Sequence, residues 1–306
     1  MGTPDFAVPS LEALDKKYDV IGIFTKPDKP NMRGKKIKFN PVKQYGIEHD
    51  IPVYQPKSLK NEEIQNQIKD LNPDLIVVVA YGKILPQEII DIPEKYGIIN
   101  VHSSLLPKYR GAAPINAAII HGEEETGVSI MYIVEALDAG DVITTRKTKI
   151  EDTDNFETLH DRLQELGSEA LLEAIEMMEE DRVVRQPQDE SKVTFVKPFK
   201  KEDCKIDWNK TSREIFNFVR GMDPLPTAYS MIDGKIFKIY QVIENDAIYE
   251  DGKNGEIVAK IKKKGFVVKT KDGSVILSQV KPENKKILTG VDIMNGNLLK
   301  IGDIFE

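Results

Sequence analysis

Residues 97–102 read GIINVH, and residues 103–111, which follow directly, read SSLLPKYRG. Two similar short runs rich in branched apolar residues occur earlier, DVIGIFT at 19–25 and LIVVVA at 75–80. Runs that stay apolar without alternating with polar residues are typical of strands buried on both faces of a sheet. These three segments therefore predict parallel strands in the core of the protein.

Helix-like stretches separate and follow these runs. One begins at Asn40, an N-cap residue followed by proline, and another covers residues 61–70. We expect residues 128–134 and 141–148 to extend the sheet, and a long amphipathic helix to begin near Thr153. The alternation of strands and helices predicts an α/β fold with an open, mostly parallel sheet.

The pattern changes after residue 180. Residues 181–207 are polar, contain two prolines and show no periodicity, which is typical of a linker. A helix is expected over residues 212–222, and short alternating strands follow it. Turn dipeptides ending in glycine separate these strands at 233–234, 251–252, 254–255, 264–265 and 272–273. Evenly spaced turns of this kind predict a small β-barrel.

The amino-acid composition indicates the cell compartment and argues against disulfide bonds and a metal site. The chain has 306 residues, 40% of them apolar, and a formal net charge of −7. It contains no run of about eighteen apolar residues and no secretory signal pattern, so we expect no membrane span and a cytoplasmic location. Cys204 is the only cysteine, which excludes an internal disulfide. The four histidines lack metal-binding spacing, so no metal is expected.

Positive charge is concentrated in one segment although the whole chain is acidic. Residues 26–43 contain seven Lys or Arg residues and one Asp. Prolines and a glycine interrupt the segment, and a long irregular loop inside a compact domain is usually functional. Phosphate contacts from such a loop would hold an RNA with salt-sensitive affinity. Lysines also gather at 192–205 and 260–271, where a solvated surface is an equally good explanation.

Asn100 and His102 are the two polar residues of the GIINVH run. They are two residues apart on a strand, so both side chains point to one face, at the strand end where open α/β sheets bind ligands. When an amine attacks a carbonyl, the oxygen gains negative charge, and one hydrogen-bond donor there contributes about 3–4 kcal/mol. Asn100 and a protonated His102 are suited to donate, and Asp138, in the tight LDAGD loop at 137–141, is suited to assist proton transfer. Alternatively, His102 is an ordinary core histidine and Asp138 only caps its glycine turn, in which case Asp141 is the candidate carboxylate.

Together these motifs resemble those of the 10-formyltetrahydrofolate-dependent formyltransferases. The resemblance rests on Asn-x-His at 100–102, Ser-Leu-Leu-Pro at 104–107, Arg-Gly at 110–111 and Leu-Asp-x-Gly-Asp at 137–141. It is closest to the members of the family that formylate methionyl-tRNA, and it covers nearly the whole chain. Further matches are GTPDF at 2–6, RGKK at 33–36, GAAPI at 111–115, ETGVSI at 125–130 and IDW at 206–208.

The resemblance implies a domain plan, a reaction and residue roles. The plan is a Rossmann-like catalytic domain at 1–182, a linker at 183–203 and an OB-like C-terminal barrel at 204–306. The reaction transfers the formyl group of 10-formyltetrahydrofolate to the amino group of methionyl-initiator tRNA, for translation initiation, without a metal. The implied roles are catalysis by Asn100, His102 and Asp138, folate binding by Ser104, Leu105, Leu106 and Pro107, and tRNA binding by Arg33, Lys35 and Lys36. A monomer is expected.

Other functions remain compatible with parts of the sequence. A formyltransferase acting on a nucleotide-sugar or glycinamide ribotide amine would share the Asn, His and Asp residues, and so would a formyltetrahydrofolate hydrolase. The first group is not expected to carry the basic RGKK segment at 33–36 in this form, and the hydrolase, whose acceptor is water, would not need RNA contacts. An RNA-binding protein with an inactive site is a further alternative, which the intact trio argues against.

The start of the sequence departs from the pattern of the resembled family. Members of that family carry a short apolar strand before the Gly-Thr-Pro-Asp-Phe stretch, whereas this sequence starts at Met1-Gly2. Without this strand, the sheet would lose what should be a central member and the core contacts on both of its faces. A start assigned a few residues late, or a trimmed chain, would explain its absence.

Overall fold

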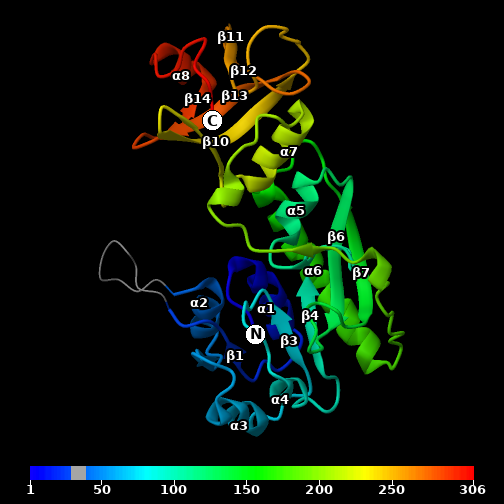
Figure 1. The fold of residues 1–306 in the computed structure, drawn as a ribbon. Helices are drawn as coiled ribbons and strands as arrows, with labels where there is room; N and C mark the ends of the chain where they lie inside the picture. The colour runs from blue at the N-terminus through cyan, green and yellow to red at the C-terminus, as the bar shows by residue number, and fades with distance from the viewer. Residues whose placement is uncertain (29–38) are drawn as a thin grey trace. The chain divides into compact units, whose positions relative to one another are not determined.

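The computed structural model describes residues 1–28 and 39–306, which form two compact units (Figure 1). Each unit combines segments that are distant in sequence. Unit 1 consists of Met1–Gly111, Thr126–Thr148 and His160–Phe195, and unit 2 of Ala112–Glu125, Lys149–Leu159 and Val196–Glu306. The domain boundaries at residues 182 and 203 stay a prediction.

Unit 1 is built on parallel strands. Its sheet strands are β1 (Ile23–Phe24), β2 (Val53–Tyr54), β3 (Ile76–Val79), β4 (Ile98–His102), β6 (Glu125–Tyr132) and β7 (Val142–Lys149). The pairs β1–β2 and β3–β4 are parallel, whereas β6 lies antiparallel to β4 and is followed in the sheet by β7. The α/β class and the mostly parallel character of this sheet are confirmed.

Helices connect these strands, and local sequence signals set where two of them begin. They are α1 (Val8–Asp15), α2 (Pro41–Glu48), α3 (Glu62–Asp70), α4 (Gln87–Ile90) and α6 (Phe156–Glu179). The Asn40 side chain accepts a hydrogen bond from the Lys43 backbone N–H, and the Asn61 side chain accepts one from that of Glu63. These N-caps satisfy backbone donors that the first helical turn leaves unpaired, so α2 and α3 begin where the sequence predicts.

A gap separates β1 from β3. Met1 and Gly2 bridge it: the Met1 amine donates to the Val77 carbonyl (2.6 Å), the Val79 N–H donates to the Met1 carbonyl (2.9 Å), and the Gly2 N–H donates to the Phe24 carbonyl (3.0 Å). Gly2 pairs in parallel with Val79, as the end of a strand would. The ladders β1–β2 and β3–β4–β6–β7 are otherwise separate.

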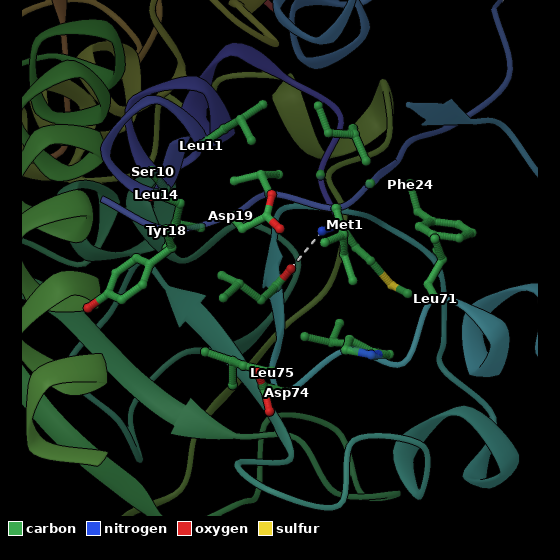
Figure 2. Close-up of a pocket in the computed structure, with 18 of the residues that line it drawn as sticks. Met1, Ser10, Leu11, Leu14, Tyr18, Asp19, Phe24, Leu71, Asp74 and Leu75 are labelled. Atoms are coloured by element: carbon green, nitrogen blue, oxygen red, sulfur yellow. Dashed lines mark hydrogen bonds between the residues drawn. The ribbon is translucent and has the colours of Figure 1, made fainter. Parts of the chain in front are cut away.

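The rest of the gap is a cavity of about 420 Å³. Apolar side chains line it, among them Leu11 and Leu14 of α1 and Leu71 at the end of α3 (Figure 2). The Met1 ammonium lies within it, and burial lowers the pKa of this group from 8.0 to about 5. Burial disfavours the charged form of this amine, because it removes the amine from water.

Unit 2 is an antiparallel β domain with helices. Its elements are α5 (Pro114–Ile120), α7 (Ser212–Met222), β9 (Ala228–Ile232), β10 (Lys235–Asn245), β11 (Ile257–Ile261), β12 (Gly265–Lys269), β13 (Ser274–Pro282), β14 (Leu288–Thr289) and α8 (Gly290–Asn295). The sheet order is β11-β12-β13-β10-β9, and β14 pairs with β13. The antiparallel β domain and the helix over 212–222 are confirmed.

The C-terminal residues join the two ends of this sheet order. The Phe305 N–H donates to the Gly255 carbonyl just before β11, and the Glu306 N–H donates to the Met231 carbonyl of β9, each at 2.9 Å. The Phe305 ring packs against Trp208 and Phe237. The ladders among the described strands form an open path, and the C-terminal segment supplies the hydrogen bonds between its ends.

No helix in the described part of the chain combines the length and the apolar character needed to cross a membrane. Within the same residues, no group of three or more His, Cys, Asp or Glu side chains is arranged to hold a metal ion.

Candidate active site

The last residues of β4 place an amide and an imidazole on one face of the sheet. Asn100 lies between Val78 of β3 and Met131 of β6, and His102 follows two residues later with the same orientation. Asn100 is half-buried, and its amide has no hydrogen-bond partner among the described residues. Its two N–H donors are therefore available to a bound molecule.

His102 lies between acceptors from two other segments. The side chain is 6% exposed; Nε2 is 3.0 Å from the carbonyl oxygen of Tyr109, and Nδ1 is 3.7 Å from Oδ2 of Asp138. A doubly protonated ring is the form that can donate toward both oxygens. The 3.7 Å separation exceeds hydrogen-bonding distance, so Nδ1 keeps its capacity to donate to a third group.

Asp138 reaches this site from the loop between β6 and β7. Its φ of 49° is a left-handed conformation that Asp tolerates better than most residues, and its Oδ2 accepts the backbone N–H of Gly111 at 2.8 Å. A Cβ on Gly140 would lie 1.9 Å from the carbonyl oxygen of Tyr132, so the loop can be this tight only with glycine there. Asp138, rather than Asp141, is the carboxylate beside His102.

The loop after β4 is held by hydroxyl groups. The Ser104 side chain is fully buried and donates to the Lys108 carbonyl (2.7 Å). The Ser129 hydroxyl donates to the Ser104 carbonyl (2.8 Å) and accepts the Leu106 N–H (3.1 Å). Of the four predicted folate-binding residues, Ser104 has its side chain buried inside this loop, whereas Leu105, Leu106 and Pro107 remain partly exposed.

A segment that the sequence suggested only as a linker also reaches the site. Within it, β8 (Phe195–Val196) pairs with β5 (Arg110–Gly111). Thr194 accepts the Tyr109 N–H on its hydroxyl (2.8 Å) and the Arg110 N–H on its carbonyl (2.9 Å). Thr194 and the nearby Gln188 were not predicted to have a role, because no periodicity or motif in this polar segment distinguishes them.

The three predicted tRNA-binding residues Arg33, Lys35 and Lys36 lie outside the described residues. The described residues next to that segment are held by hydrogen bonds: Lys43 Nζ donates to Asp28 and to Gln55, and Gln55 donates to Asp28 and to the Lys26 carbonyl. This network joins the chain before the segment to the chain after it.

The cavity between β1 and β3 is a different place from this cluster of polar residues. Its lining includes none of Asn100, His102 and Asp138. The polar side chains at the end of β4 therefore lie outside this cavity.

Comparison with known proteins first defines the class. The family model described as formyl transferase matches residues 1–175, and the model of the formyl transferase C-terminal domain matches residues 198–298. The chain belongs to the formyl transferase family. Its α/β sheet with a polar cluster at the end of β4 is the part that the first model covers.

Within this family, two relatives with high sequence identity are methionyl-tRNA formyltransferases. The chain is 58% identical to the methionyl-tRNA formyltransferase of Fusobacterium nucleatum subsp. nucleatum over 99% of this chain and 97% of that protein. It is 46% identical to the methionyl-tRNA formyltransferase of Sulfurihydrogenibium sp. over 100% of this chain and 98% of that protein.

A solved structure shares the fold at lower identity. It is WlaRD, described as a sugar 3N-formyl transferase in the presence of dTDP and 5-N-formyl-THF, with a TM-score of 0.65 and 22% identity over 93% of this chain and 97% of that one. At this level of identity, the likeness supports the fold alone.

Proposed function

We propose that this chain transfers the formyl group of 10-formyltetrahydrofolate to the amino group of methionyl-initiator tRNA. The observation that carries the proposal is 58% identity to a methionyl-tRNA formyltransferase over 99% of the chain. A sugar or ribotide amine as acceptor has weaker support, since the sugar formyltransferase structure is only 22% identical.

The proposed reaction is a direct transfer between two nitrogens. The methionine amine attacks the formyl carbon and forms a new C–N bond. The bond from that carbon to the folate nitrogen then breaks, and one proton leaves the attacking amine while one reaches the leaving nitrogen. The Asn100 amide and Nδ1 of His102 are the donors that would stabilise the negative oxygen in between.

Asp138 is the proposed proton acceptor. One of its oxygens, Oδ2, holds the Gly111 N–H and faces His102, so the carboxylate is oriented before a substrate arrives. An oriented carboxylate within reach of the reacting amine contributes through general base catalysis. Asp138 thus contacts Gly111 and His102, which both lie outside its own loop. A residue that only capped the glycine turn would not need these contacts.

The remaining assignments follow the family resemblance. Folate contacts are proposed at Ser104, Leu105, Leu106 and Pro107, and the hydroxyl of Ser104 also holds the loop that presents the other three. Contacts to the tRNA are proposed at Arg33, Lys35 and Lys36, and we propose a monomeric, cytoplasmic enzyme. Sedimentation of the pure chain tests whether it is a monomer, because one copy has a mass of 34.6 kDa.

The proposal is tested by formyl transfer from labelled 10-formyltetrahydrofolate. Methionyl-initiator tRNA is compared with an elongator methionyl-tRNA, and the wild-type chain with His102→Ala. Transfer that prefers the initiator and is lost in His102→Ala supports both the acceptor and the site. Folate binding without transfer to either tRNA would instead favour a small amine as acceptor.

A further inference from the structure

We propose that Gln188 is a positioning residue for this reaction, which holds the Asp138 loop against His102. The inference rests on the proposed roles of those two residues. All the groups involved belong to unit 1, and they join β5, the loop between β6 and β7, and the segment that follows α6.

The amide of Gln188 is fully used by this arrangement. Its Nε2 donates to the carbonyl oxygens of Asp138 and Gly140, each at 2.8 Å, and its Oε1 accepts from Nε of Arg110 at 3.0 Å. An amide nitrogen has two hydrogens, and both are directed to the same tight loop. The side chain therefore fixes the position and orientation of the peptide groups on both sides of Ala139.

Arg110 in turn fixes the orientation of Gln188. This residue is 3% exposed, and its guanidinium also binds the carboxylate of Glu190, with NH2 to Oε1 at 2.7 Å. A buried guanidinium donating to an amide oxygen leaves the amide nitrogen facing the loop. Reversal of the Gln188 amide would place an NH₂ group against the Arg110 donors.

The segment that contains Gln188 and Thr194 binds the residues that face the two ring nitrogens of His102. Gln188 holds Asp138, which faces Nδ1, and Thr194 holds Tyr109, whose carbonyl faces Nε2. Without the two Gln188 donors, the backbone carbonyls of the left-handed Asp138 and of Gly140 would lose these bonds, and the Gly111 N–H would be left to hold the carboxylate that lies 3.7 Å from Nδ1. A displacement of about 1 Å in a reacting group can cost about 100-fold in rate.

The test compares Gln188→Met, which keeps the size of the side chain and loses both donors, with Gln186→Met. Gln186 lies two residues earlier in the same segment, its side chain is exposed, and it pairs with Val142 only through its backbone. We expect Gln188→Met to lower kcat by about 10- to 100-fold with both KM values within twofold, and Gln186→Met to leave all of them unchanged. Gln188→Glu, which keeps the acceptor for Arg110, should lose kcat as well.

A double variant separates positioning from a general loss of structure. If Gln188 acts through Asp138, then Gln188→Met should cost less than about twofold further in an Asp138→Asn background. Losses that multiply, a rise in KM without a loss of kcat, or full activity of both Gln188 variants or of Asp138→Asn would overturn the proposal.

A readout independent of activity distinguishes this inference from the proposed function. The ring NMR signals of His102 should move in Gln188→Met and not in Gln186→Met, while those of the other three histidines, His49, His121 and His160, stay in place. A wild-type chain that transfers no formyl group would refute the proposed function, and the His102 signals would still decide the positioning role. Unmoved His102 signals would refute that role.

Discussion

Asn100 is a half-buried amide without a hydrogen-bond partner among the described residues, two positions from His102. Its removal should affect the transition state more than the fold, because no described contact of its amide is lost. We expect Asn100→Ala to lower kcat by about 100- to 1000-fold, the usual effect of removing one oxyanion donor. Single-turnover formylation measures this, with thermal unfolding as the control for folding. A loss of less than about fivefold would exclude Asn100 as an oxyanion donor.

At the scale of single elements, α7 offers a clean test of capping. The Thr211 hydroxyl accepts the Glu214 N–H (3.2 Å), and a Glu214 carboxylate oxygen accepts the Thr211 N–H (2.9 Å). Thr211→Ala removes one half of this capping box and should destabilise unit 2 by about 1 kcal/mol, whereas Thr211→Ser should cost less than about half as much. Trp208, the only tryptophan, is buried in unit 2, so its fluorescence reports this unfolding transition. Equal effects of the two substitutions would argue against the cap.

Elements with local signals could be predicted from the sequence, and contacts across long distances in the chain could not. The starts of α2 and α3 follow from Asn40 and Asn61, because an N-cap acts within three residues. The shared face of Asn100 and His102 could be predicted because side chains alternate between the two faces of a strand. The bond from Gln188 to the Asp138 carbonyl spans 50 residues, and neither end carries a periodic pattern. The helix α1 escaped prediction as well, because its eight residues are too few to show a sustained apolar periodicity.

At the scale of the whole molecule, the net charge of −7 disfavours binding of RNA over the whole surface, so the proposed tRNA contacts belong to local basic segments. Replacing Arg33, Lys35 and Lys36 by alanine should lower tRNA affinity and reduce the slope of log affinity against log salt by roughly 2–3, with the KM for the formyl donor unchanged. Filter binding over a series of salt concentrations measures the slope.

A second triple variant is the matched control for net charge. Lys262, Lys263 and Lys264 are exposed in the turn between β11 and β12, and their replacement by alanine changes the net charge by the same amount. We expect a smaller change of slope there. Equal slopes for the two triple variants would show that total charge, rather than the segment at residues 26–43, governs binding.

The hydrogen bonds of the C-terminal segment bear on how the protein withstands exopeptidases. Phe305 and Glu306 occupy backbone groups beside β11 and on β9 that would otherwise be open to another strand. Removal of the last four residues by a carboxypeptidase would expose these edges together with the faces of Trp208 and Phe237 that Phe305 covers. Unpaired strand edges next to apolar surface recruit other chains, so a trimmed population should self-associate and precipitate where the intact protein stays dispersed.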